Sequence, residues 1–381
     1  MNKQSKVLLV RNADYKDFGG AERYPIFLAQ SLKKCNYDSV IISRSPSLLH
    51  FAESNSVNYM RGWWWPRQNW TGFRVLLTPI YILWQIILYF WYLFIIISTK
   101  PSVLHIQSKD DFIAGTLAGK TLGKKIIWTD HADLKHIFKN LSVFYKNPIG
   151  KLVYACGLLV DGLIIASNNE KRLVCENIGS GSRLLKKMVV AYIGVSDGKD
   201  RYNRKPHPEL TFGIATRLVT DKGIGEAIEA FNKLNKSYIN TKLLIIGDGP
   251  EAAKFKRLAG TNVNIVFTGH LADPFEEMTN LDVFIHPTYH ESFSTSLVEA
   301  SMLGLPIITT NVGGNPEIIK DNKTGLLVEA RNVESLYKAM EKMYQDKKLR
   351  KELGYNARLQ YVEKFNFDNI VKQQYVGLYE K

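Results

Sequence analysis

One stretch in the second half of the chain, residues 286–317, restricts the fold more than any other feature. An apolar run ends just before Pro287, a polar loop follows, and residues 297–303 have a helical pattern that Gly304 closes. Residues 307–309 then resemble another buried strand. This order predicts a βαβ unit in a parallel sheet. Open parallel sheets bind ligands beyond the carboxyl ends of their strands, so we expect a site in these loops.

Two carboxylates in this stretch are candidates for binding hydroxyl groups, because an ionised carboxylate is a hydrogen-bond acceptor. They are Glu291 in the loop and Glu299 just inside the helix. The N–H groups at the start of the helix favour a phosphate. The residues that supply them are Phe293, Ser294, Thr295 and Ser296. Such a site suits a sugar nucleotide. The alternative is that both glutamates are ordinary charges at the start of a helix.

The spacing Glu291-x7-Glu299, followed by Gly304-Leu-Pro306, resembles the signature of the retaining GT-B glycosyltransferases of family 4, also called glycosyl transferases group 1. The resemblance covers nearly the whole chain through further motifs in the order of the family. These are Gly19-Gly20-Ala-Glu-Arg23, Arg217-Leu-Val-Thr-Asp-Lys222-Gly223, Gly247-Asp-Gly-Pro250, Gly313-Gly314-Asn-Pro-Glu317 and Thr324-Gly325-Leu-Leu-Val328. The chain departs from the family at Ile193, where Asn usually precedes Gly-Val.

The resemblance implies an α/β fold of the GT-B type, with two Rossmann-like domains that face each other across a cleft. Residues 1–196 would form the domain that binds the acceptor, and residues 209–365 the domain that binds the nucleotide sugar. The charged segment 196–209, which contains prolines, is typical of a linker. The last helix, within residues 366–381, would cross back onto the first domain.

The resemblance also implies roles for residues of the second domain. Glu299 would hold the ribose hydroxyls, and Glu291 the hydroxyls of the donor sugar. Arg217 and Lys222 would stabilise the departing diphosphate, as two cations beyond a strand can. For this pair, two solvated surface charges are the alternative. Backbone near the nucleobase completes the predicted donor site, at Gly247, Gly269 and His270.

In the first domain, His131 follows a predicted strand and stands where the family has its active-site histidine, beside the donor sugar. A structural histidine is the alternative. Asp130 and Asp133 are weaker candidates. Gly19 and Gly20 precede a predicted helix, where backbone can approach a ligand closely. By resemblance this loop lies over the diphosphate of the donor.

Neither a metal nor another cofactor is expected. No DxD-type pair stands where a catalytic metal would bind, and Asp110-Asp111 opens a predicted helix instead. The three cysteines are widely spaced, which fits a reducing compartment. The apolar run near the N-terminus is too short for the core of a signal peptide, so we expect a cytoplasmic protein.

The basic charge is concentrated in the first half of the chain. Residues 1–195 carry 25 Lys and Arg against 12 Asp and Glu, whereas residues 196–381 carry 25 against 24. We find no nucleic-acid-binding motif, so we expect no nucleic-acid partner. An anionic membrane surface is the expected partner of this basic half.

A segment of 23 residues without a charge, residues 75–97, supports a membrane partner. Tryptophans precede it at positions 63–65 and 70, and tryptophan favours the membrane interface. A simple span conflicts with the strand at 103–107, which should join the same sheet as residues 6–10. We expect a half-buried helix whose other face meets the membrane, with help from Arg67, Arg74 and Lys100. A fully buried helix and a re-entrant hairpin are the alternatives.

Together these features predict a retaining glycosyltransferase that moves a hexose from a nucleoside-diphosphate sugar to a saccharide acceptor. The membrane features suggest a lipid-linked acceptor in surface polysaccharide or glycolipid biosynthesis, and a peripheral location on the inner face of the cell membrane. A GT-B epimerase or phosphorylase and a non-catalytic membrane-bound protein that binds sugar nucleotides are the alternatives.

Overall fold

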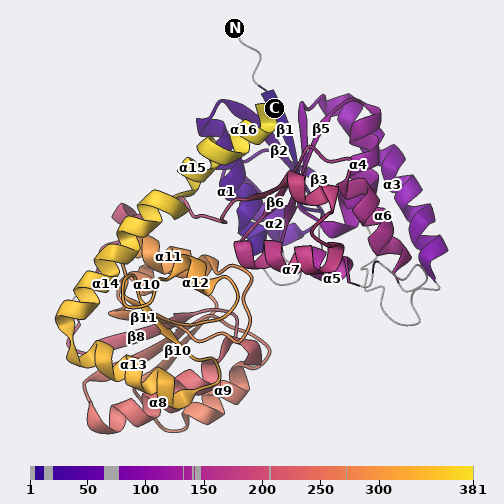
Figure 1. Ribbon diagram of the computed structural model, residues 1–381. Coiled ribbons are helices and arrows are strands. Elements are labelled where there is room, and N and C mark those ends of the chain that lie inside the picture. Colours follow the sequence, from indigo (N-terminus) through magenta and orange to yellow (C-terminus); the bar gives the residue numbers. More distant parts are fainter. Residues whose placement is uncertain are drawn as a thin grey trace. The chain divides into compact units, whose positions relative to one another are not determined.

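The computed structural model describes residues 5–12, 20–63, 77–131, 133–139, 141, 147–205, 207–271 and 273–380 (Figure 1). The chain is divided into two compact units. The first comprises Met1–Ile193 with Phe367–Lys381, and the second comprises Gly194–Asn366. Each unit contains one parallel sheet covered by helices, as in a Rossmann-like domain.

The sheet of the first unit has seven parallel strands in the order β3-β2-β1-β4-β5-β6-β7. They are β1 (Ser5–Val10), β2 (Tyr37–Ser43), β3 (Tyr59–Arg61), β4 (Val103–Ile106), β5 (Lys125–Asp130), β6 (Gly162–Ile165) and β7 (Met188–Val190). The chain adds β2 and β3 on one side of β1 and then β4 on the other side. The carboxyl ends of β1 and β4 therefore form the topological switch point, where open sheets of this kind bind ligands.

The sheet of the second unit has six parallel strands in the order β10-β9-β8-β11-β12-β13. They are β8 (Leu210–Ala215), β9 (Thr241–Ile246), β10 (Ile265–Gly269), β11 (Val283–His286), β12 (Ile307–Thr310) and β13 (Leu326–Val328). Here the order reverses between β8 and β11. The switch point of this sheet therefore lies at the start of the 286–317 stretch.

Helices connect the strands of both sheets. The first unit contains α1 (Gly20–Lys34), α2 (Pro46–Ser54), α3 (Thr78–Thr99), the turn η2 (Lys109–Asp111), α4 (Phe112–Thr121), α5 (Leu134–Ile137), α6 (Pro148–Gly157), α7 (Asn168–Ile178) and the turn η3 (Arg183–Lys187). The second contains the turns η4 (Lys199–Arg201) and η5 (Thr220–Lys222), α8 (Ile224–Ser237), α9 (Ala252–Ala259), α10 (Phe275–Thr279), α11 (Thr295–Leu303), α12 (Asn315–Ile318), α13 (Val333–Gln345), α14 (Lys347–Gln360) and the π-helical turn η6 (Tyr361–Phe365). Several begin at a polar cap; the side chains of Asn147, Ser167 and Asn332 accept backbone N–H groups in this way.

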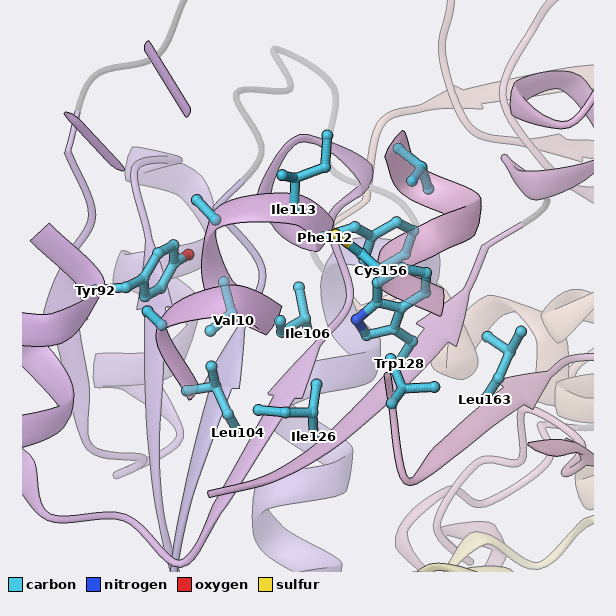
Figure 2. Close-up of a cluster of buried hydrophobic side chains, with 14 of the residues drawn as sticks. Val10, Tyr92, Leu104, Ile106, Phe112, Ile113, Ile126, Trp128, Cys156 and Leu163 are labelled. Carbon is cyan, nitrogen blue, oxygen red and sulfur yellow. The ribbon is translucent and has the colours of Figure 1, made fainter. Parts of the chain in front are cut away.

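Alternate side chains of the first sheet form two apolar clusters, one on each face. One cluster joins the sheet to α3, α4 and α6 through side chains such as Leu104 and Ile106. Trp128 lies fully buried in this cluster (Figure 2). Its ring stacks on Phe112 with the centroids 4.1 Å apart, and its Nε1 donates to the Thr116 hydroxyl at 2.8 Å.

The C-terminal segment packs on the first unit, as predicted. It consists of α15 (Phe367–Ile370), the π-helical turn η7 (Val371–Tyr375) and α16 (Val376–Glu380). The hydroxyl of Tyr379 lies 2.6 Å from Nδ1 of His105, and Nε2 of His105 lies 2.6 Å from the Thr129 hydroxyl. These buried contacts attach the segment to β4 and β5.

Residues 197–205, part of the segment predicted as a linker, are attached to the second unit. Asp197 forms an ion pair with Arg358 at 2.6 Å, and the Tyr202 hydroxyl donates to Asp273 at 2.8 Å. This segment therefore packs as part of the second unit.

The apolar segment predicted at 75–97 contains one continuous helix, α3. Tyr81, Gln85, Leu88 and Tyr92 are buried, whereas large apolar side chains on its other face are exposed. The fully buried helix and the re-entrant hairpin are therefore wrong. By length and composition α3 could cross a bilayer, but β4 pairs with β1 in one sheet, which excludes a single crossing between these two strands.

Most of the tryptophan-rich segment lies outside the described residues. This applies to the predicted membrane contacts at Trp64, Trp65, Arg67, Trp70 and Arg74. Trp63 is described; it is 42% exposed and its ring lies edge-on to Trp84 with the centroids 6.0 Å apart.

We expect Trp128→Ala to lower the free energy of unfolding of the first unit by roughly 3–5 kcal/mol, because it leaves a cavity in the core. Trp128→Phe should cost less, since it can keep the stacking on Phe112. Chemical denaturation followed by circular dichroism measures both changes. Leu159→Ala, at a side chain 46% exposed, is the control. A loss for Trp128→Ala no larger than that of the control would contradict this packing.

Candidate functional site

Two loops meet at the switch point of the second sheet. One follows β8 and ends in η5, and the other follows β11. The N–H of Tyr289 and the hydroxyl of Thr288 both donate to the carbonyl of Asp221, at 2.8 and 3.0 Å. These two hydrogen bonds hold the loops together.

Gly223 allows the first loop to turn into α8 at this meeting point. Its φ of +66° lies in the left-handed region. A Cβ at this position would lie 2.0 Å from the carbonyl oxygen of Pro287 in the other loop. Any larger residue would therefore push the loops apart, so this glycine sets their separation.

Lys222 and Glu291 form an ion pair between these loops, with Nζ and Oε2 2.7 Å apart. Their side chains are 24% and 18% exposed, so the pair is largely shielded from water. The structure thus brings together two of the predicted site residues. Lys222 is therefore not the solvated surface charge that the sequence left as an alternative for Arg217 and Lys222.

His286 completes this group and is a residue that the sequence analysis did not predict. Its Nε2 lies 3.5 Å from Oε2 of Glu291 and 3.2 Å from the hydroxyl of Ser294. Its position as the last residue of a parallel strand is the signal that could have identified it, because that edge of the sheet carries the site.

The electrostatics of the group determine the protonation states of Glu291 and His286. Burial alone would raise the pKa of Glu291, but His286 and Lys222 outweigh it and lower the pKa to about 2. Burial lowers the pKa of His286, although Glu291 opposes this change. Near neutral pH the group therefore combines an ionised carboxylate with an uncharged imidazole.

The start of α11 lies beside this group. The hydroxyl of Ser294 accepts the N–H of Leu297 at 3.3 Å, which makes Ser294 the N-cap. Thr295 and Ser296 form the first turn, and Phe293 is buried just before it. The predicted N–H groups are therefore at the start of a nine-residue helix, where they favour an anion.

The other residues predicted in the second domain are distributed along the same unit. Glu299 lies in α11 and is only 9% exposed, so it is not an ordinary solvated charge. Arg217 follows β8 and is exposed. The N–H of Gly247 donates to the carbonyl of Gly269 at 3.0 Å, which joins the ends of β9 and β10. His270 follows this contact and is exposed.

His131 directly follows β5 in the first unit. Its ring lies edge-on to Tyr24, with the centroids 5.1 Å apart. Burial and the charge of Arg11 hold the pKa of His131 well below its ordinary range, so its imidazole is uncharged near neutral pH.

The remaining candidates of the first unit lie at the starts of helices or outside the described residues. Gly20 begins α1, and Gly19 lies outside the described residues. The carboxylate of Asp130 accepts the N–H groups of Asp133 and Leu134 at 2.8 and 3.1 Å, so it organises the start of α5. In the described part of the chain, no group of three or more His, Cys, Asp or Glu residues is arranged to hold a metal.

The two parallel α/β units and the returning C-terminal segment define a two-domain GT-B fold, the fold of many glycosyltransferases. The family model of Glycosyltransferase Family 4 matches residues 18–198, and that of Glycosyl transferases group 1 matches residues 197–360. These matches together span nearly the whole chain. The chain therefore belongs to the family 4 glycosyltransferases, and it is a transferase.

Known glycosyltransferases are similar to this chain in sequence, and solved structures share its fold. The capsular polysaccharide biosynthesis glycosyltransferase CapM of Staphylococcus aureus is 26% identical over 74% of this chain and 77% of its own length. A glycosyltransferase structure from Rickettsia africae covers 100% of this chain and 98% of its own, with a TM-score of 0.78 and 20% identity. Anabaena HepE in complex with UDP-glucose covers 99% of this chain and 100% of its own, with a TM-score of 0.74 and 16% identity.

We expect Glu291 to stabilise the fold above about pH 4.5 and to lose this effect as the pH falls toward 2. Its pKa is about 2 in the folded protein against an ordinary value of 4.5, so the folded state favours the ionised form. The difference in melting temperature between wild type and Glu291→Gln should be largest near neutral pH and shrink on acidification. Calorimetry between pH 7 and 3 measures this difference. A difference that grows on acidification would contradict the pairing.

Proposed function

We propose that the chain transfers a hexosyl group from a nucleoside-diphosphate sugar to a hydroxyl group of a saccharide acceptor, with retention at the anomeric carbon. The ion pair of Lys222 with Glu291, at the switch point of the second sheet, carries this proposal. A cation there can stabilise a departing diphosphate, and an ionised carboxylate can accept hydrogen bonds from sugar hydroxyls. The UDP-glucose in the HepE structure supports a nucleotide sugar as donor.

Each predicted residue has a role in this reaction. Lys222 and Arg217 stabilise the departing diphosphate. Glu291 binds hydroxyls of the donor sugar, and Glu299 binds those of the ribose. His131 lies beside the donor sugar. Backbone at several predicted positions assists them, at Gly19, Gly20, Gly247, Gly269, His270, Phe293, Ser294, Thr295 and Ser296.

His286 adds a reason why the ion pair can take part in binding. Glu291 contacts both Lys222 and His286. When Lys222 turns toward a diphosphate, Glu291 keeps the imidazole as a partner. The carboxylate therefore does not lose all its partners while it exchanges one for sugar hydroxyls.

The same groups make a metal unnecessary in the proposed reaction. Side-chain cations and the N–H groups at the start of α11 stabilise the charge of the departing diphosphate. The bond from the anomeric carbon to the diphosphate oxygen breaks as the bond to the acceptor oxygen forms on the same face of the sugar, and the departing diphosphate takes the proton of the acceptor hydroxyl. No carboxylate is required as a covalent nucleophile in this route.

We assign the reaction to polysaccharide or glycolipid biosynthesis, with a lipid-linked acceptor. The name of CapM places that relative in capsular polysaccharide synthesis. A phosphatidylinositol N-acetylglucosaminyltransferase subunit of Arabidopsis thaliana is 20% identical over 93% of this chain and 82% of its own length. The second name supports an acceptor found at a membrane, because phosphatidylinositol is a lipid.

The exposed face of α3 supports binding to the inner face of the cell membrane. Phe90 and Phe94 are 62% and 67% exposed on this helix. Further exposed apolar side chains lie on the same helix, at Ile80, Ile82, Leu83, Ile86, Ile87 and Ile97. A continuous apolar surface of this kind is typical of an interaction site. The excess of basic residues in 1–195 suits the anionic lipids of that surface.

We expect the purified protein to hydrolyse one nucleotide sugar from a panel of UDP-, GDP-, ADP- and dTDP-sugars, and EDTA should not prevent this. Lys222→Ala and Glu291→Ala should each lower the rate by roughly 10²- to 10³-fold, because they remove groups that act on the donor. Release of the nucleotide measures turnover.

Lys233→Ala is the matched control, since Lys233 forms an exposed ion pair with Glu334 in the same unit. Its rate should equal that of wild type. Equal rates for all three variants would contradict the assigned site, and a loss of turnover in EDTA would contradict the absence of a metal requirement.

We expect the change of both Phe90 and Phe94 to Glu to reduce binding to phosphatidylglycerol vesicles at least 10-fold, because each buried phenyl group contributes about 1.5–3 kcal/mol. Co-sedimentation measures the bound fraction. Ile239→Glu, at a side chain 76% exposed in the second unit, should bind as wild type does. Unchanged binding of the double variant would exclude α3 as the membrane contact.

A further inference from the structure

A chain of hydrogen bonds joins the C-terminal segment to the interior of the first unit. The hydroxyl of Tyr375 lies 2.7 Å from that of Tyr24, which in turn lies 3.4 Å from the hydroxyl of Thr129. His105 continues the chain, since its two ring nitrogens lie 2.6 Å from the hydroxyls of Thr129 and Tyr379. All five side chains are buried. The chain therefore begins and ends on the C-terminal segment and passes through α1, β5 and β4.

Tyr24 is the member of this chain that contacts a predicted site residue. It lies in α1, one turn after Gly20. Its ring lies edge-on to the imidazole of His131, with the centroids 5.1 Å apart. The same ring packs against Phe367 of the C-terminal segment, with the centroids 5.7 Å apart. One side chain thus connects α1, the residue after β5 and the C-terminal segment.

The orientation of His131 depends on packing. A hydrogen bond at one ring nitrogen commonly fixes the ring of a functional histidine. Nε2 of His131 is buried and has no hydrogen-bond partner among the described residues. Edge-to-face contacts between rings are directional, so the ring of Tyr24 restricts the plane of the imidazole.

The hydroxyl of Tyr24 holds this ring in place. Burial raises the pKa of Tyr24 to about 12, and it raises that of Tyr375 as well. Both hydroxyls therefore keep their protons near neutral pH, and one donates to the other. This bond fixes the tip of the Tyr24 ring, while α1 fixes its base.

Other contacts attach the C-terminal segment to the first unit. α15 and η7 pack beside α1 (Figure 1). There the carboxylate of Asp368 accepts the hydroxyl of Ser31 at 2.7 Å. Lys125 donates to the carbonyl of Tyr379 at 2.8 Å. Loss of the Tyr375 hydroxyl alone should therefore leave the segment in place.

We propose that Tyr24 is a positioning residue for His131, and that Tyr375 of the C-terminal segment holds Tyr24 for this task. The inference rests on the proposed function, in which His131 lies beside the donor sugar. The last helical segment of the chain then acts on catalysis through one pair of tyrosines.

Three variants test the two contacts separately. Tyr24→Phe and Tyr375→Phe each remove one hydroxyl and should lower kcat roughly 3- to 10-fold, as expected for one lost hydrogen bond. Tyr24→Leu also removes the ring contact and should lower kcat roughly 10²-fold, because a small displacement of a catalytic group is costly. Affinity for the nucleoside diphosphate of the donor, measured by calorimetry, should stay at the wild-type value in all three.

Tyr379→Phe is the matched control. It also removes a buried hydroxyl from the C-terminal segment, but this hydroxyl bonds to His105, whereas that of Tyr375 bonds to Tyr24. The melting temperature should fall about as much as in Tyr375→Phe, while kcat should equal that of wild type. Equal losses of kcat in the two variants would overturn the proposal, because attachment of the segment would then explain both.

A double variant distinguishes positioning from general destabilisation. If Tyr24 acts through His131, Tyr24→Phe should lower kcat in the wild-type protein but not in the His131→Ala background. The same loss in both backgrounds would overturn the proposal, since Tyr24 would then act independently of His131.

Exchange of the C2 hydrogen of the His131 imidazole, followed by mass spectrometry, tests the contact without turnover. Burial and the charges of Arg11 and His105 lower the pKa of His131. Tyr24→Leu should admit water, raise this pKa and accelerate the exchange roughly 3-fold or more, whereas Tyr379→Phe should not. Tyr24→Phe should give a smaller increase, and it decides the matter if Tyr24→Leu does not fold.

The two proposals can fail separately. If wild type consumes no donor, the proposed function fails, while the exchange at His131 still decides on the contact with Tyr24. Exchange at the wild-type rate in the Tyr24 variants would overturn the positioning role, even where donor turnover supports the proposed function.

Discussion

The close approach of the loops after β8 and β11 determines the charge pattern at the carboxyl edge of the second sheet. Gly223 permits it, since a Cβ would meet the carbonyl of Pro287. The approach places Lys222 within 2.7 Å of Glu291, and this contact in turn orients the carboxylate toward His286. The charge pattern at this edge therefore depends on a backbone conformation that only glycine adopts without strain.

The strands of both sheets could be predicted from the sequence because most of them are continuous apolar runs. Predicted strands at residues 6–10, 103–107 and 307–309 match β1, β4 and β12 closely. In parallel sheets both faces are buried, so such runs are distinctive. The π-helical turns η6 and η7 were not predicted, because a shift from i→i−4 to i→i−5 hydrogen bonding leaves no clear trace in composition.

The candidate site could be predicted from the sequence only in part. The sequence suggested charge stabilisation for Lys222 and hydroxyl binding for Glu291, but their direct pairing depends on two loops far apart in sequence. No role was predicted for His286, because sequence spacing alone did not indicate that its side chain contacts Glu291.

Hydrogen bonds attach α3 to the elements that directly follow β4. The side-chain amide of Gln85 donates to the carbonyl of Asp110 and accepts the N–H of Ala114, both at 3.0 Å. The Tyr92 hydroxyl donates to Asp111 at 2.8 Å. Three hydrogen bonds thus clamp this helix to η2 and the first turn of α4, immediately after Gln107 and Ser108. A tilt of α3 would therefore move η2 and the start of α4 with it.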